Sequence, residues 1–247
     1  MYKHLVTLGL LVTISCYSPD QQTPETSTNA IPQITENPTE VESVANELVE
    51  SFSDDSKIGK PRRNKIQLDI FKRLTSDSAY KPNNVAVVKL YSLASSNEWI
   101  LKQTLEIEDH ALADSDPKIE DFNNDGLKDI TFVSNTAARG ANVVRTLLIY
   151  DKTRDELVWI RNSEDYPNLA YNKTLNCIDA WLFHGTTTTV FLRLDGDRLR
   201  EFASVGTGSD LVVTVAENNG EEREILRKKM REEDVYTRYR TYNPPRP

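Results

Sequence analysis

Cysteine is nearly absent from the sequence: the chain of 247 residues has only two, Cys16 and Cys177. Small exported domains that depend on disulfides carry many more, so a disulfide framework is excluded as the main source of stability. Cys177 lies among Leu175, Ile178 and Ala180, which favours a buried apolar side chain over a nucleophile. The fold must therefore depend on a hydrophobic core, with a bound metal ion as a further support.

The chain also lacks an excess of positive charge, because its formal net charge is −8. Proteins that bind nucleic acid usually neutralise phosphates with clustered Lys and Arg, so we expect no nucleic-acid partner. The acidic balance is compatible with cations or basic protein surfaces as partners. A simple contribution to solubility explains it equally well.

No apolar run is long enough to cross a membrane as a helix. The longest one follows Lys3 and covers about ten residues, 5–14, whereas a bilayer core is ~30 Å thick. Ser15 and Cys16 follow it directly, and a small residue before Cys at this point resembles the bacterial lipobox. We expect a signal peptide at residues 1–15 and a lipid on Cys16, which predicts an outer-membrane lipoprotein of the bacterial cell envelope, attached to the membrane through this lipid. An ordinary signal peptide with an incidental Cys is the alternative.

Three short segments precede the main domain. Residues 16–38 are rich in Pro, Thr, Gln, Asn, Ser and Glu and are typical of a disordered tether. Residues 39–52 have apolar side chains at helical spacing, and Thr39 and Glu42 fit a capping box, so a short amphipathic helix is predicted. Residues 53–64 are polar and are interpreted as a linker. The main domain is then expected at residues 65–247.

The main domain shows the patterns of β-strands separated by short polar breaks. Such patterns occur at 66–70, 85–91, 99–105, 130–133, 143–150, 157–160, 176–183, 190–194, 199–205 and 211–215. The breaks at 151–155, 195–197 and 218–220 resemble hairpin turns. Residues 221–234 have a helical composition but follow a hairpin turn, so we expect a strand. No helix-length segments lie between the strands, which predicts an all-β fold of mostly antiparallel hairpins.

The segment 121–129, with the sequence DFNNDGLKD, carries the clearest chemical signal. Side chains with oxygen atoms occupy its positions 1, 3, 5 and 9, which are Asp121, Asn123, Asp125 and Asp129. Calcium requires six to eight oxygen ligands, and Gly126 permits the sharp turn that brings alternate residues toward one centre. The carbonyl of Leu127 can supply a further oxygen. We therefore predict a Ca²⁺ site formed by these five residues, with a solvated Asx-rich turn as the alternative.

The flanks of this loop differ from a helix–loop–helix calcium site. Phe132 stands at position 12, where a bidentate Glu is expected, and the flanking residues favour strands. The pattern predicts a calcium loop inserted between two strands.

Residues from Ile119 to about Val205 resemble a group of bacterial periplasmic proteins with a β-propeller-like fold and one calcium loop. The resemblance rests on the order of the DFNNDGLKD loop, a polar loop with Gly, and the segments LLIYDK, NLAYN and LDGDRL. The group includes inhibitors of lysozyme-type muramidases found near secretion systems. The resemblance implies a propeller-like fold, the same calcium ligands and a lysozyme-like protein partner in the cell envelope; it identifies no inhibitory residues.

The sequence favours a binding protein over an enzyme, because it has no nucleophile elbow, no HExxH motif and no phosphate-binding Gly loop. A triad of His184 with Ser209 and Asp210 is a weak alternative. We expect an inhibitor or other protein-binding module whose exposed loop 134–142 enters a partner; its candidate contact residues are Arg139, Gly140 and Asn142. A surface adhesion or glycan-binding module with a structural calcium is the second hypothesis.

Overall fold

The computed structural model describes residues 46–73, 84–109, 114–217, 221–230 and 234–247. These residues belong to one compact unit. They form antiparallel β-sheets and two single-turn 3₁₀ helices, η1 (Ala138–Gly140) and η2 (Ser163–Asp165), and no α-helix occurs among them. In these ranges no helix has the length and apolar character needed to cross a bilayer. The predicted all-β class with antiparallel pairing is confirmed.

The first sheet contains four strands in chain order: β1 (Asn46–Asp54), β2 (Asn64–Arg73), β3 (Asn84–Leu93) and β4 (Trp99–Asp109). Alternate residues of β2 and β3 are buried, as the period of two in the sequence predicts. One face of this sheet therefore contributes to the core.

The second sheet also has four strands: β5 (Lys118–Glu120), β6 (Asp129–Ala137), β7 (Asn142–Asp151) and β8 (Glu156–Trp159). Successive residues of β6 and β7 are buried without alternation. Both faces of this sheet are therefore covered, which explains why the two strands are almost continuously apolar in sequence.

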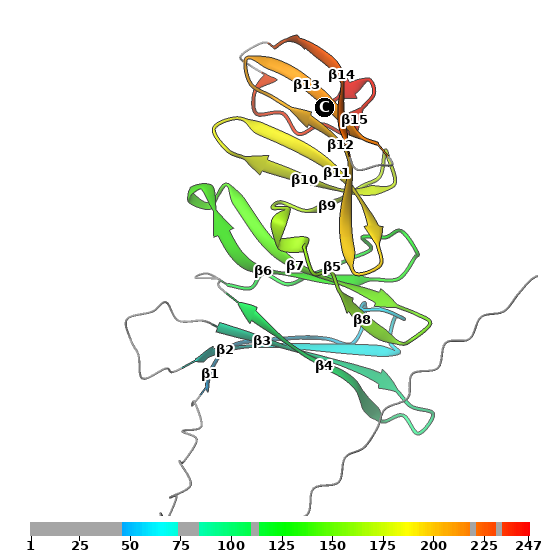
Figure 1. The fold of residues 1–247 in the computed structure, drawn as a ribbon. Coiled ribbons are helices and arrows are strands. Elements are labelled where there is room, and N and C mark those ends of the chain that lie inside the picture. Colours follow the sequence, from blue (N-terminus) through cyan, green and yellow to red (C-terminus); the bar gives the residue numbers. More distant parts are fainter. Residues whose placement is uncertain (1–45, 74–83, 110–113, 218–220, 231–233) are drawn as a thin grey trace, which may run out of the picture. The chain divides into compact units, whose positions relative to one another are not determined.

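The third sheet has six strands: β9 (Ala170–Asn172), β10 (Cys177–Phe183), β11 (Thr187–Asp195), β12 (Arg198–Gly206), β13 (Asp210–Ala216) and β14 (Glu222–Lys229). β14 confirms residues 222–229 of the strand expected at 221–234, and residues 218–220 and 231–233 lie outside the described residues. A small hairpin of β15 (Thr241–Tyr242) and β16 (Pro245–Arg246) follows. Figure 1 shows each sheet as a meander of strands that are neighbours in the chain.

Three hydrophobic clusters join these layers. The first places Leu68 and Val88 of the first sheet against Phe132 of the second. The second cluster lies between the opposite face of the second sheet and the third sheet, where it includes Leu147 and Val190. The third covers the far face of the third sheet with C-terminal residues such as Tyr239 and Tyr242.

The predicted helix at 39–52 is wrong for its described part, because residues 46–52 belong to strand β1. β1 pairs with β2 along its length, with a register shift between Leu48 and Glu50. Pairing with the edge of an existing sheet outweighs a helical spacing of apolar residues, since local preference is weak against tertiary contacts. Residues 39–45 lie outside the described part, as do the predicted signal peptide 1–15 and tether 16–38.

The predicted linker at 53–64 is also corrected, because it packs into the domain. The carboxylate of Asp54 accepts main-chain N–H bonds from Ser56, Lys57 and Ile58. Ile58 is fully buried in the first hydrophobic cluster. The folded domain therefore begins at β1 rather than at residue 65. The polar composition of 53–64 did not reveal this, because a single buried residue, Ile58, holds the segment against the core.

Candidate functional site

The predicted calcium loop connects β5 to β6, and Asp129 is the first residue of β6. The loop is therefore flanked by strands, as the sequence indicated. Gly126 has a φ of +87°, and a Cβ there would meet nothing within 4 Å. Its role is conformational, because the left-handed region is costly for residues with a side chain.

Three of the predicted ligands accept main-chain N–H bonds inside the loop. Gly126 N donates to Asp121 Oδ2 at 3.0 Å, Asp125 N donates to Asn123 Oδ1 at 3.1 Å, and Leu127 N donates to Asp125 Oδ1 at 2.9 Å. These bonds hold one oxygen of each side chain toward the main chain. The second oxygens of Asp121 and Asp125 are left for another ligand.

Asp129, at the start of β6, joins the loop to the sheet through two hydrogen bonds. The amide of Phe122 donates to its Oδ2 at 2.8 Å, and the amide of Tyr150 on β7 donates to its Oδ1 at 2.9 Å. Burial raises the pKa of Asp129, and the negative charges of Asp125 and Asp121 also raise it, whereas the two hydrogen bonds lower it. The net result is a pKa of about 7. The three carboxylates therefore repel one another through the loop.

A cation fits one particular feature of this loop. Asp121 Oδ1 is buried and has no hydrogen-bond partner, which is costly for a carboxylate oxygen. In the described part of the chain, no three His, Cys, Asp or Glu side chains are gathered as ligands of one metal ion. The predicted set contains three carboxylates, and those of Asp121, Asp125 and Asp129 are not gathered in this way. Both oxygens of Asp129 already accept main-chain N–H bonds, so Asp129 is a support of the loop and the other four predicted residues are left as ligands.

The predicted contact loop forms the tip of the β6–β7 hairpin, and residues 135–141 are exposed. Three successive residues at the tip have positive φ angles: Ala138 at 49°, Arg139 at 56° and Gly140 at 89°. For residues with a Cβ, this left-handed conformation costs about 1–2 kcal/mol each. The tip thus holds Arg139 outward in a strained backbone.

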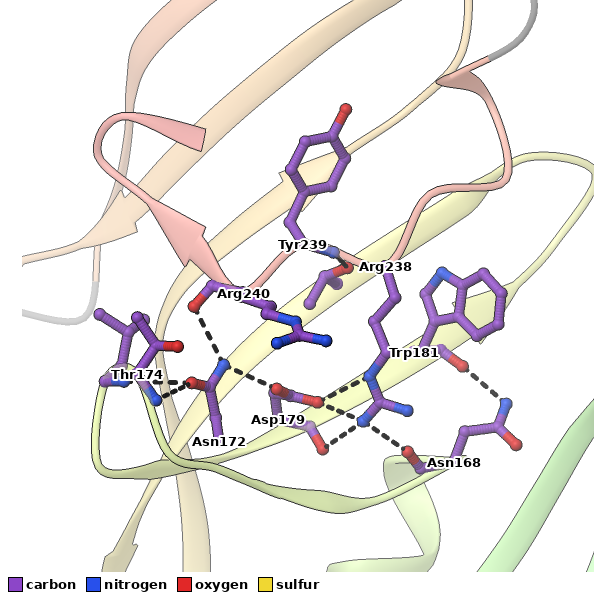
Figure 2. Close-up of polar contacts among 10 residues, drawn as sticks. Asn168, Asn172, Thr174, Asp179, Trp181, Arg238, Tyr239 and Arg240 are labelled. Carbon is purple, nitrogen blue, oxygen red and sulfur yellow. Dashed lines mark hydrogen bonds and ion pairs between the residues drawn. The ribbon is translucent and has the colours of Figure 1, made fainter. Parts of the chain in front are cut away.

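The base of this hairpin is fixed by two asparagines. The side chain of Asn142 exchanges two hydrogen bonds with the backbone of Phe183 on β10, at 3.0 and 2.9 Å. Asn168 Nδ2 donates to Ala141 O at 2.9 Å and to Trp181 O at 2.7 Å; the latter bond is visible in Figure 2. Asn142, predicted as a contact residue, is therefore occupied in holding the tip, and Arg139 and Gly140 are the exposed members of the set.

The other residues that the sequence singled out lie apart from these loops. Cys177 is free, and burial raises the pKa of its thiol to about 12, in agreement with the predicted apolar role. His184 contacts Thr188 Oγ1 at 3.1 Å, and Asp210 forms ion pairs with Arg227 and Lys229 instead of a triad with His184. Cys16 lies outside the described residues.

Two polar clusters were missed by the sequence reasoning. Asp155, in the β7–β8 turn, accepts bonds from Asn64, Ser92 and Tyr150. Asp179 pairs with Arg238, which lies 59 positions further along the chain. No local pattern marks either cluster, because their members come from distant segments. Some members do lie in segments on which the resemblance rests: Tyr150 in LLIYDK, and Asn168 and Asn172 in NLAYN.

No protein-family model matches the sequence, and no curated protein sequence matches it either. A solved structure of a Xanthomonas Type IV secretion system related protein is similar, with a TM-score of 0.43 and 13% sequence identity. The similarity covers 74% of this chain and 98% of that protein.

Proposed function

We propose that this chain is a calcium-stabilised, non-enzymatic binding module that uses the β6–β7 hairpin tip to inhibit a lysozyme-type enzyme in the bacterial cell envelope. The run of three left-handed residues at Ala138–Gly140 carries this proposal. Strained backbone persists where the surrounding structure imposes it, and it concentrates at sites that bind ligands or partners. Here the hydrogen bonds of Asn142 and Asn168 fix the base from which this tip extends.

The chemistry of Arg139 supports a glycosidase cleft as the target. Glycoside hydrolases of this kind use two carboxyl groups that flank the scissile bond. A guanidinium group binds carboxylates through paired, charge-assisted hydrogen bonds, and the Arg139 side chain makes no hydrogen bond or ion pair with the described residues. The net charge of −8 would favour the approach of a basic enzyme.

An inhibition assay with matched variants tests this function. The whole chain is titrated into muramidase assays with several lysozymes, and Arg139→Gly is compared with Arg62→Gly. Arg62 is a suitable control because it is another exposed arginine with positive φ, at 59°. We expect Arg139→Gly to weaken inhibition at least tenfold and Arg62→Gly to leave it unchanged. Neither change should reduce stability, since glycine adopts this backbone freely.

Unaltered activity of every lysozyme at micromolar protein would refute the inhibitor function. Equal inhibition by the wild-type chain and Arg139→Gly would instead refute the role of the hairpin tip.

The calcium part of the proposal has its own experiment. A cation held by Asp121, Asn123, Asp125 and Leu127 O would give Asp121 Oδ1 a partner and relieve the repulsion among the carboxylates. Calcium should therefore raise the melting temperature of the wild-type chain, because a ligand of the folded state alone stabilises it. Asp125→Ala should remove this rise, whereas Asp55→Asn, an exposed acid outside the loop, should retain it. Identical wild-type melting curves with calcium and with chelator would refute the site.

The propeller-like arrangement is part of the same proposal. Each sheet is an antiparallel meander in chain order, and the second sheet packs on both of its faces, as a blade does between two other blades. In this interpretation the calcium loop and the hairpin tip are connections of the second blade.

Attachment to the membrane through Cys16 remains a proposal from the sequence. Radioactive palmitate should label the wild-type chain in a bacterial host, and Cys16→Ala should remove the label and release the protein from membranes. Label that persists in Cys16→Ala would contradict it.

A group of three aromatic side chains, of which Tyr236 is exposed, favours glycan binding as a second candidate function. The rings of Phe183 and Tyr236 stack at 6.4 Å, Trp181 lies 4.3 Å from Phe183, and Tyr236 is 65% exposed. Such rings can stack on sugars. Retention on insoluble peptidoglycan without any lysozyme inhibition would support this function, and release of the protein in the wash would oppose it.

A further inference from the structure

A hollow of about 420 Å³ lies between the β9–β10 hairpin and the C-terminal segment. It is lined by nine residues, of which the charged ones are Lys173, Asp179, Arg238 and Arg240. It shares no residue with the calcium loop or with the β6–β7 hairpin tip. Its chemistry is therefore separate from the function proposed above.

The carboxylate of this pocket is already neutralised. Asp179 is buried, and Arg238 Nε donates to its Oδ1 at 2.9 Å. Asn172 Nδ2 donates to its Oδ2 at 2.8 Å. Arg238 also donates to Asn168 O at 2.9 Å, so this ion pair fastens the C-terminal segment to the third sheet (Figure 2). Both oxygens of Asp179 are thus engaged by protein donors.

Two cations of the pocket are not engaged in this way. The side chains of Lys173 and Arg240 make no hydrogen bond or ion pair within the described part of the chain, and both residues are exposed. Figure 2 shows the guanidinium of Arg240 turned toward the Asp179–Arg238 pair, with no interaction drawn to it. Their donors are therefore available to a ligand.

The charge of the lining sets the class of that ligand. Three cations and one carboxylate leave a net charge of +2 around the pocket, in a chain whose net charge is −8. Guanidinium and ammonium groups bind phosphate and carboxylate oxygens through short, charge-assisted hydrogen bonds. A dianion would neutralise the pocket, whereas a neutral ligand would leave two like charges facing each other.

We propose that this pocket binds a small doubly charged oxyanion, either a phosphate group or a dicarboxylate. Lys173 and Arg240 supply the contacts to the ligand. The Asp179–Arg238 pair holds the C-terminal segment in place and lines the pocket beside them.

Calorimetric titration of the whole chain tests this inference. Inorganic phosphate and succinate are the two probes, in a chloride buffer free of both. We expect saturable binding of at least one probe with one site per chain. Saturation by phosphate alone assigns the site to phosphate groups, and saturation by succinate alone assigns it to dicarboxylates.

The matched variants remove one cation each. Lys173→Gln and Arg240→Gln should each weaken binding about tenfold, which corresponds to about 1.4 kcal/mol. Lys102→Gln, an exposed lysine on β4, is the control and should bind as the wild type does. All three positions are exposed, so the melting temperatures should stay unchanged.

Absence of saturable binding by both probes would overturn the inference. So would binding that both pocket variants retain in full, or an equal loss in Lys102→Gln, since the latter would indicate general screening of charge.

Discussion

Glu201 on β12 is a partly buried carboxyl group near a second acid, Glu222, and both features disfavour its charged form. Burial raises its pKa to about 7, and the negative charge of Glu222 raises it further, against a hydrogen bond from Ser204 that lowers it. In the unfolded chain, Glu has a pKa near its ordinary value of 4.5. The folded state therefore binds a proton more tightly than the unfolded state does, and this group favours folding only at low pH.

This difference predicts a stability change with a definite sign. The contribution of Glu201 should be complete below pH 4.5 and lost as the pH rises through about 7. Glu201→Gln should therefore be more stable than the wild type at pH 7.5, by on the order of 1 kcal/mol after allowance for solvent screening, and equal to it at pH 4. Urea unfolding at the two pH values measures this. A variant that is less stable than the wild type at pH 7.5 would contradict it.

Asp155 shows how a hairpin of the second sheet is held to the first. Asn64 of β2 donates to its Oδ1 at 3.0 Å, and Ser92 of β3 donates to its Oδ2 at 2.6 Å. The hydroxyl of Tyr150 donates to Oδ1 at 2.5 Å. Burial opposes ionisation, but these three hydrogen bonds and the charge of Lys60 outweigh it and hold the pKa of Asp155 below its usual value.

Loss of this carboxylate should loosen the contact between the two sheets. Asp155→Ala should lower the free energy of unfolding at pH 7 by about 3 kcal/mol, because charge-assisted hydrogen bonds contribute about 1.5–3 kcal/mol each and water partly replaces them. The stabilisation is present above the ordinary pKa of 3.8 and is lost as the pH falls through the lower folded value. The gap between wild type and variant should thus narrow below pH 4 in denaturant melts. A gap that widens there would contradict the assignment.

The strands of the domain were predictable to different degrees. Patterns of alternating or continuous apolar residues located all the longer strands from β2 to β4 and from β6 to β13, since burial imposes those patterns. β1 was missed because its apolar residues follow a helical spacing, and two of them, Leu48 and Val49, are exposed in the sheet. Its pairing with β2 is a property of the assembled sheet.

The candidate sites were predictable only where their residues are close in sequence. The loop 121–129 was found because residues with side-chain oxygens recur within nine positions. The burial of Asp129 was not predicted. The strained tip at Arg139 had no signal beyond one glycine, and the pairing of Asp179 with Arg238 depends on a crossing 59 positions away.

The domain as a unit begins earlier than its polar N-terminal segment suggested. Glu50 of β1 accepts hydrogen bonds from the amide and hydroxyl of Ser115, and Ile58 is fully buried. Gly59 N donates to Lys128 O at 2.9 Å, which ties this segment to the loop 121–129. A cut within residues 53–64 would therefore remove core and sheet contacts.

Two shortened chains test this boundary. Residues 43–247 should unfold cooperatively with the melting temperature of the whole chain. For residues 65–247, the free energy of unfolding should fall by several kcal/mol, and the chains should associate with one another. The reasons are that β2 would become an unprotected sheet edge and that the buried Ile58 would be missing. Circular dichroism and sedimentation measure both effects. A stable, monomeric 65–247 chain would restore the boundary predicted from the sequence.

Within each described sheet, every strand pairs only with the strands that precede and follow it in the chain. Loop closure is therefore cheap at each step, because strands separated by short connections meet before distant segments must be brought together. Each meander can close as soon as its final strand emerges from the ribosome. The chain thus suits vectorial folding, in which the N-terminal layer provides a finished surface on which the next layer assembles.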